Sequence, residues 1–177
     1  MDGVVVRRVA AAITFPLRQQ VLRPHQSVDD MALPGDDDSR SGHFAASFGG
    51  QVVGTASIRV EPPPWTSEHD AAWRLRGMAT APPFRSRGVG TALLRAVLRH
   101  VAGHGGGLVW CNARTPATAF YSRHGFAVRG ELWEDPDIGP HVQMWRTVTA
   151  PEGTAPPSPA DPGPDDRAEP RATMPPR

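Results

Sequence analysis

The stretch from residue 85 to residue 101 constrains the fold more strongly than any other part of this sequence. Its first seven residues, 85–91, read RSRGVGT, and apolar residues then recur at helical spacing. This spacing predicts an amphipathic helix over residues 88–101 with one buried face. Residues 72–80 are expected to form a strand before it, and a strand–turn–helix unit of this kind is typical of an α/β domain.

The rest of the sequence predicts one mixed sheet. Short apolar or alternating runs indicate strands, and apolar residues spaced by three to five indicate helices. Strands are expected at residues 4–8, 43–48, 51–60, 72–80, 108–112, 126–128 and 142–145, and helices at 14–23, 88–101 and 116–124. The pair Gly49-Gly50 supplies the positive φ that a tight hairpin turn needs. The predicted order is β-α-β-β-β-α-β-α-β-β, an α/β fold with a mixed sheet.

The composition changes abruptly near residue 150. Nine of the 20 prolines lie in the last 27 residues, beside almost no large apolar side chains. Such a segment cannot bury enough surface to offset the entropy lost on ordering. We therefore expect a folded domain over residues 1–150 and a Pro-rich disordered tail over 151–177.

Residue counts exclude several classes of function. All 19 basic residues are arginine, so a Walker A lysine and a Schiff-base lysine are both absent. The single cysteine excludes an intramolecular disulfide, and the histidines show no metal-ligand spacing, so no metal site is expected. A formal charge of +1 gives no argument for nucleic acid. Without a long apolar run or a signal peptide, we expect a cytoplasmic protein with no membrane partner.

The loop at residues 85–91 has the chemistry of a phosphate site. A helix start presents unpaired N–H groups and a partial positive charge. Glycines let the main chain approach an anion closely, and arginines add forked donors. Leu93 occupies the third glycine position of a dinucleotide-binding loop, which disfavours that ligand. The alternative is an ordinary tight turn with solvated arginines.

At this point the chain resembles the GCN5-related N-acetyltransferase (GNAT) superfamily. The first motif runs from Arg74 through Met78-Ala79-Thr80 into the glycine loop, and the second comprises Asn112, Ala119-Phe120-Tyr121 and Gly125-Phe126. The resemblance covers about residues 43–147. It implies an N-acetyltransferase domain over 1–150 with a splayed central sheet flanked by helices, and acetyl-CoA as the co-substrate.

The resemblance also implies how acetyl-CoA is held. The diphosphate would lie on the amides of residues 86–91 and the two loop arginines, and the pantetheine arm would pair with the edge of the strand at residues 78–80. The Met78 N–H is the candidate donor to the thioester oxygen. The implied cofactor-binding residues are Met78, Ala79, Thr80, Arg85, Ser86, Arg87, Gly88, Val89, Gly90, Thr91 and Asn112.

Tyr121 occupies the family's general-acid position and is the only tyrosine in the chain. A phenol is a weaker acid than a thiol, so it would serve as a hydrogen-bond donor or a late acid to the departing sulfur. The structural alternative is an aromatic residue that packs beside Phe120. Cys111 could in principle carry an acetyl group, but its apolar strand favours inert packing.

Several residues are candidates for the general base that removes a proton from the amine, and the sequence does not choose among them. Glu61 ends a strand where acids can face a substrate channel, and His141 begins a late strand and carries an imidazole that exchanges protons near neutral pH. Glu68 and Asp70 lie in a loop. Each of these residues has the alternative of being solvated or structural.

The resemblance implies that the acceptor is a small-molecule amine or a protein amine. Its identity would depend on the loops at residues 25–42, 61–72 and 132–141. Arg74 and Arg76 would attract an acidic substrate or are simply solvated. Two rival functions are a non-catalytic acyl-CoA-binding module that acts through a protein partner and a peptide-interaction protein that acts through the tail. A homodimer is also open, because a late strand at the sheet edge would permit pairing.

Overall fold

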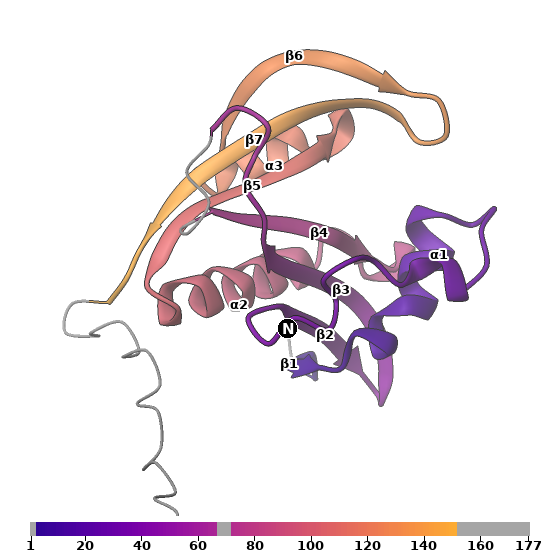
Figure 1. The fold of residues 1–177 in the computed structure, drawn as a ribbon. Helices are drawn as coiled ribbons and strands as arrows, with labels where there is room; N and C mark the ends of the chain where they lie inside the picture. The colour runs from indigo at the N-terminus through magenta and orange to yellow at the C-terminus, as the bar shows by residue number, and fades with distance from the viewer. Residues whose placement is uncertain (1–2, 67–71, 152–177) are drawn as a thin grey trace, which may run out of the picture.

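A single seven-stranded sheet forms the body of the protein (Figure 1). The computed structural model describes residues 3–66 and 72–151, so the tail beyond residue 151 and the candidate acids Glu68 and Asp70 lie outside the described residues. The strands are β1 (Val5–Val9), β2 (Gly42–Phe48), β3 (Gln51–Val60), β4 (Ala72–Thr80), β5 (Gly106–Arg114), β6 (Ala127–Asp135) and β7 (Gly139–Thr149). The α-helices are α1 (Phe15–Leu22), α2 (Val89–Gly103) and α3 (Thr118–Arg123). Short 3-10 turns occur at Ala11–Thr14, Asp29–Met31, Pro82–Phe84 and Thr115–Ala117.

The order of strands across the sheet is β1-β2-β3-β4-β5-β7-β6. Every neighbouring pair is antiparallel except β4 and β5, which run parallel. The predicted mixed sheet and the predicted order of helices and strands are confirmed. The parallel pair is joined through α2, as a parallel crossover requires.

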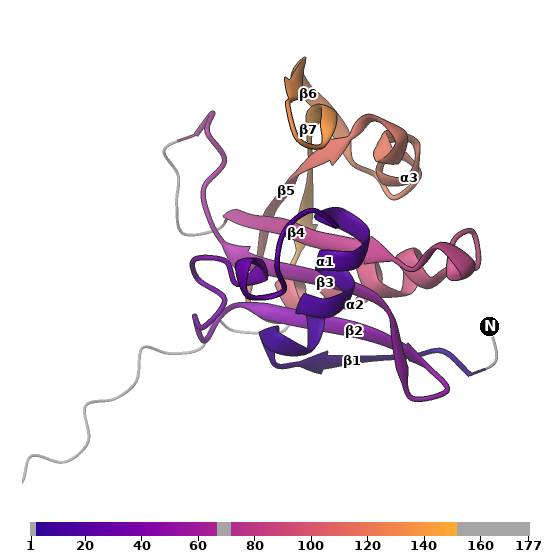
Figure 2. The same cartoon turned by 90° about the vertical axis from the view of Figure 1, so that its right-hand side faces the viewer.

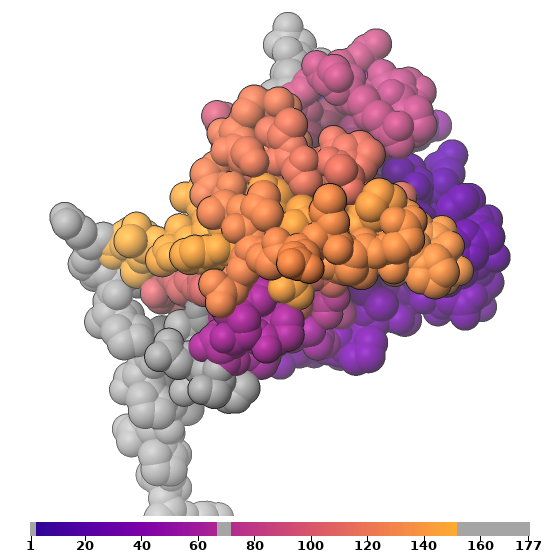
Figure 3. All heavy atoms as spheres, turned by 90° about the horizontal axis from the view of Figure 1, so that it is seen from above, coloured from indigo at the N-terminus to yellow at the C-terminus, as the bar shows by residue number. Residues whose placement is uncertain are grey.

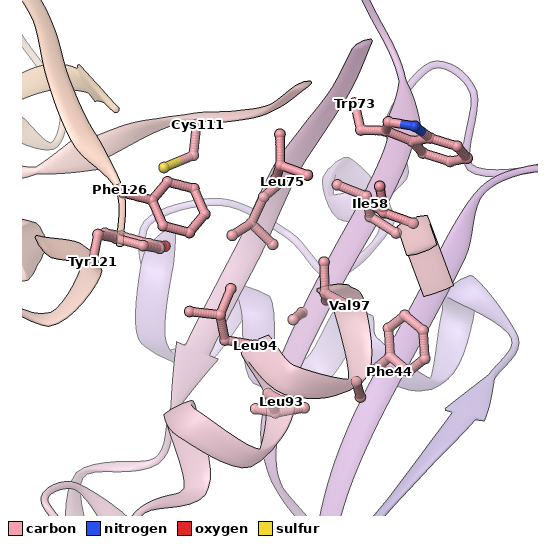
Figure 4. Close-up of a cluster of buried hydrophobic side chains, with 14 of the residues drawn as sticks. Phe44, Ile58, Trp73, Leu75, Leu93, Leu94, Val97, Cys111, Tyr121 and Phe126 are labelled. Carbon is pink, nitrogen blue, oxygen red and sulfur yellow. The ribbon is translucent and has the colours of Figure 1, made fainter. Parts of the chain in front are cut away.

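Helix α2 packs the core against one face of the sheet, while α1 lies on the other face, over β3 and β4 (Figure 2). Leu93 and Val97 of α2 are fully buried. Figure 4 shows Val97 directed toward Ile58 of β3, and a methyl group of Leu93 packs against Gly54 of the same strand. This buried face is the one that the helical spacing predicts, and it fixes the start of α2 beside the end of β4.

The two parallel strands separate soon after they meet. β4 pairs with β5 only where residues 72–74 face residues 108–110, and farther along the two strands diverge (Figure 1). The later residues of β4 and β5 therefore have no partner strand on the sides that face each other. This is the splayed central sheet that the resemblance implies.

A bulge in β4 lies within this open half. Thr55 and Ser57 of β3 pair with Ala79 and Arg76, so two residues of β4 oppose one residue of β3. Gly77 has a φ of +59°, and a Cβ there would lie 2.5 Å from Nε of Arg18. Only glycine combines this conformation with such a close approach. The sequence analysis did not predict this bulge.

The structure corrects the bounds of the last three strands. β5 begins at Gly106, inside the glycine run expected to end the helix, and α2 itself ends at Gly103. β6 and β7 are several residues longer than predicted. Because β6 is exposed along nearly its whole length, it lacks the apolar alternation that marks a half-buried strand, and main-chain pairing with β7 holds it.

Candidate functional site

A cavity of about 550 Å³ lies at the splay between β4 and β5. Its wall combines the open halves of these strands with the chain from Arg18 to Pro34, with Tyr121 of α3, and with the tip of the β6–β7 hairpin. Figure 3 shows the hairpin reaching across the molecule to this N-terminal segment. Two of the three loops expected to recognise the acceptor, at residues 25–42 and 132–141, therefore contribute to one cavity.

Tyr121 reaches the splay from α3. Its side chain is buried, and its hydroxyl donates a hydrogen bond to Sδ of Met78 on β4 at 3.5 Å. The ring of Tyr121 packs against that of Phe126 at 5.3 Å, and Figure 4 shows both rings on the side of the core where Cys111 of β5 lies. Burial raises the pKa of Tyr121 well above its usual value, and the neighbouring Cys111 raises it further. The hydroxyl thus keeps its proton and is placed between the two diverging strands.

Cys111 has the properties of a packed thiol. Burial raises its pKa to about 12, which outweighs the opposite effects of the Tyr121 hydroxyl and the Arg74 charge. Only a thiolate is an effective nucleophile. The structure therefore favours the inert interpretation over an acetyl-cysteine.

We expect Cys111 in the native protein to resist alkylation by iodoacetamide at pH 8. A thiol with a pKa of about 12 instead of 9.0 holds about a thousandfold less thiolate at that pH. The measurement is mass spectrometry of protein labelled with and without denaturant. Rapid labelling of the folded chain would contradict this description of Cys111.

His141 lies in the wall of the same cavity, in the first residues of β7. Its side chain is buried, its ring stacks on that of Trp133 at 5.6 Å, and its Nδ1 lies 2.6 Å from the carbonyl oxygen of Gly139. Because a carbonyl can only accept, Nδ1 carries a proton and donates. In the neutral ring this leaves Nε2 as the basic nitrogen.

Glu61 lies outside the cavity wall. Its carboxylate accepts hydrogen bonds from Nε of Arg59 at 2.5 Å and from Nη1 of Arg74 at 2.7 Å. Burial alone would raise its pKa, but the hydrogen bonds and charges of the two arginines outweigh burial and lower the pKa of Glu61. A carboxylate held in this way is a weak base, so His141 is the better candidate of the two.

The glycine loop precedes α2 at the end of β4. Ser86 and Gly88 have φ values of +58° and +78°, and the main-chain N–H groups of residues 86–88 donate to no acceptor among the described residues. Arg85 donates through Nε to the Thr80 carbonyl oxygen at 3.3 Å, and the Arg87 guanidinium lies 5.9 Å from the Phe84 ring centroid. These contacts hold both arginines at the loop.

The loop and the splay lie close together. The hydrogens of Gly90 face Phe120 and Met78, since a Cβ there would approach these side chains at 3.4 and 3.7 Å. Asn112 is exposed on β5 and lines the cavity with Met78, whereas Ala79 is buried. The remaining predicted cofactor residues, Thr80, Val89 and Thr91, continue from the end of β4 into the first turn of α2.

The structure also reveals a basic wall that the sequence analysis saw only in part. Six arginines line the cavity: Arg18, Arg23, Arg59, Arg74, Arg76 and Arg114. From the sequence, only Arg74 and Arg76 are candidates to attract an acidic substrate. The others come from α1, its C-terminal end, β3 and β5, which meet only in the folded chain.

Residues 3–66 and 72–151 contain neither a cluster of metal ligands nor a membrane-spanning helix. Within these ranges no three His, Cys, Asp or Glu side chains lie close enough together to hold a metal ion. None of the helices described is both long enough and apolar enough to cross a bilayer.

Comparison with known proteins found a family model and a relative that match most of this chain. The model of the acetyltransferase (GNAT) family matches residues 12–126. The uncharacterized N-acetyltransferase YitI of Bacillus subtilis (strain 168) is 32% identical over 143 residues, which cover 81% of this chain and 95% of YitI.

Two solved structures share the fold. Ard1 from Thermoplasma volcanium has a TM-score of 0.66 at 20% identity, with 82% of this chain and 98% of that chain covered. An aminoglycoside 6'-N-acetyltransferase solved with coenzyme A has a TM-score of 0.65 at 12% identity, with 83% and 98% covered.

Proposed function

Because the chain belongs to the GNAT family of acetyl-CoA-dependent N-acetyltransferases, we propose that it moves acetyl directly from acetyl-CoA to a primary amine in the splay cavity. One observation carries this proposal. The buried hydroxyl of Tyr121 lies between two separated strands, beside a loop in which the N–H groups of residues 86–88 donate to no acceptor among the described residues.

The loop is the proposed diphosphate site. The N–H groups of residues 86–91 would bind the phosphate oxygens at the positive end of the α2 dipole, with Arg85 and Arg87 beside them. The positive φ of Ser86 and Gly88 turns the main chain at this point. The GNAT-fold aminoglycoside acetyltransferase solved with coenzyme A supports a coenzyme A site on this fold.

The pantetheine arm would follow the open edge of β4. Residues 75–80 have no strand partner on the side that faces β5, so an extended chain can pair with them as an added strand. At the bulge, Gly77 and Met78 face the single residue Ala56 of β3, which interrupts the ladder. This interruption supports the Met78 N–H as donor to the thioester oxygen, with Asn112 across the splay.

The amine must be neutral when it attacks. An alkyl amine with a pKa near 10 is only about one part in a thousand neutral at pH 7, which costs roughly 4 kcal/mol. We assign proton removal to Nε2 of His141, which lines the cavity with its Nδ1 held by Gly139. The new bond joins the amine nitrogen to the acetyl carbon, and one nitrogen proton passes to His141.

The carbon–sulfur bond then breaks and coenzyme A leaves as a thiolate. The hydroxyl of Tyr121 would turn from Met78 and donate a hydrogen bond to this sulfur. Since burial raises the pKa of Tyr121, the hydroxyl stabilises the thiolate as a donor, and the sulfur takes its final proton from solvent.

The proposal is tested by thiol release from acetyl-CoA in the presence of a library of amines. We expect turnover above the rate in buffer for at least one amine, with the acetylated amine identified by mass spectrometry. If coenzyme A binds but no amine is acetylated, the rival function as a non-catalytic acyl-CoA-binding module is correct.

A further inference from the structure

We propose that the acceptor amine carries an anionic group, a carboxylate or a phosphate, and that Arg23 and Arg114 bind this group at the mouth of the cavity. This inference rests on the proposed function, because it specifies the substrate class of that site. It is carried by the charges of the cavity wall and by the partners that each arginine has or lacks.

The wall holds more positive than negative charge. Six arginines line it, together with the carboxylates of Asp30 and Asp135. Two more carboxylates, Asp36 and Glu61, pair with arginines of the wall from outside the cavity. Six cations against four anions leave two positive charges in excess, and a cleft with such an excess concentrates and orients anionic ligands.

Four of the six arginines already form ion pairs, and two carboxylates serve all four. Asp36 lies 3.5 Å from Arg18 and 2.7 Å from Arg76, and Glu61 joins Arg59 and Arg74 as described above. Arg18 is also held by the Met31 carbonyl oxygen and by the hydroxyl of Ser57. Ion pairs thus hold these four side chains over the sheet, while Nε of Arg18 and Nε of Arg76 have no hydrogen-bond partner among the described residues.

Arg23 and Arg114 are the two arginines of the wall that form none of these ion pairs. Neither makes an ion pair among the described residues, and Nη1 of Arg23 is buried without any hydrogen-bond partner there. The two guanidinium groups are close enough to repel each other: burial lowers the pKa of Arg114, the charge of Arg23 lowers it further, and Asp135 only partly offsets this. A buried donor without a partner and two like charges side by side are costly unless an anion joins them.

The two carboxylates of the wall, Asp30 and Asp135, accept hydrogen bonds from groups other than these arginines. Asp135 accepts from the main-chain N–H groups of Asp137 and Ile138 in the β6–β7 turn, and Asp30 accepts from the N–H and hydroxyl of Ser27. Forked guanidinium groups match the oxygens of a carboxylate or phosphate, which can accept from both arginines at once.

A purely structural role for the two arginines explains only one of their donors, Nη2 of Arg114. Nη2 of Arg114 donates to the carbonyl oxygen of Leu22, the last residue of α1, at 2.9 Å, which stabilises the helix end. This contact explains why Arg114 would contribute to stability. It does not explain the unpartnered Nη1 of Arg23, a residue that lines the same cavity.

The test compares acceptors that differ in charge. The probes are ω-amino carboxylates from β-alanine to aminohexanoate, the matching carboxamides, and the matching aminoalkyl phosphonates. In the wild type we expect kcat/KM for the best anionic probe to exceed that of its carboxamide at least about tenfold, since one charge-assisted hydrogen bond accounts for that factor. The ratio between carboxylate and phosphonate identifies which anion the site prefers.

The double variant Arg23→Gln/Arg114→Gln is expected to reduce this preference to about one. Arg23→Gln alone, which removes no side-chain hydrogen bond among the described residues, should lower the preference several-fold and serves if the double variant does not fold. The control Arg7→Gln/Arg99→Gln removes the same charge from exposed positions outside the cavity and should keep the preference. A preference for carboxamides, or one that survives the Arg23/Arg114 substitutions, overturns the inference.

Failure of the proposed function gives a different result. In that case no probe is acetylated, and calorimetry with the same carboxylates and phosphonates decides the question. Heat seen with the wild type and lost in the double variant retains the anion site, whereas no heat with either protein rejects it.

Discussion

Replacing Tyr121 by phenylalanine is expected to lower kcat about a hundredfold while leaving the Kd for acetyl-CoA within about twofold of the wild type. The ring would keep its contacts with Phe120 and Phe126, and only the hydroxyl that faces the splay would be lost. The departing thiolate would then have no donor at that position. Steady-state thiol release and a calorimetric titration with acetyl-CoA give the two quantities.

The matched control is Cys111→Ala, which changes the other side chain at this point of the splay. Because the thiol is buried with a pKa of about 12, we expect kcat to stay within about threefold of the wild type. Loss of turnover in Cys111→Ala, with a covalent acetyl-enzyme in the wild type, would replace direct transfer by a two-step route. Full turnover in Tyr121→Phe would remove Tyr121 from the mechanism.

The substitution Gly88→Val is expected to weaken acetyl-CoA binding about a hundredfold. Gly88 adopts a φ of +78° at the residue before α2, a conformation that a β-branched side chain rarely adopts. The loop must shift, and the loss of two charge-assisted hydrogen bonds to the diphosphate corresponds to about 3 kcal/mol or that hundredfold change. Calorimetry with acetyl-CoA measures it.

Gly103→Val at the other end of α2 is the control for this substitution. A Cβ at Gly103 would meet no atom within 4 Å, and its φ is not in the left-handed region, so we expect binding equal to that of the wild type. Circular dichroism checks that both variants fold. If Gly88→Val folds and binds acetyl-CoA with unchanged affinity, the diphosphate does not lie on this loop.

The sequence predicted the parts of this fold that local patterns determine. The apolar spacing of α2 identified its buried face, the pair Gly49-Gly50 identified the hairpin turn, and residues 72–80 form β4 with the predicted bounds. In each case the signal lies within about fifteen consecutive residues. The length of β6 has no such signal, because pairing with β7 rather than burial holds that strand.

The cavity could be predicted only in part, for the same reason. The glycine loop and His141 are recognisable from their residue types, whereas Tyr121 follows from the resemblance to the GNAT family. The pairing of Glu61 with Arg59 and Arg74, which weakens it as a base, depends on two adjacent strands. The unpaired Arg23 is recognisable only when its surroundings are known, since most arginines in a sequence are solvated.

The most direct measurement of the central claim is a crystal structure of the full chain with acetyl-CoA. We predict diphosphate oxygens about 3 Å from main-chain nitrogens of residues 86–91, and the thioester sulfur within hydrogen-bond reach of the Tyr121 hydroxyl. A diphosphate bound elsewhere, or a thioester outside the gap between β4 and β5, would contradict the account.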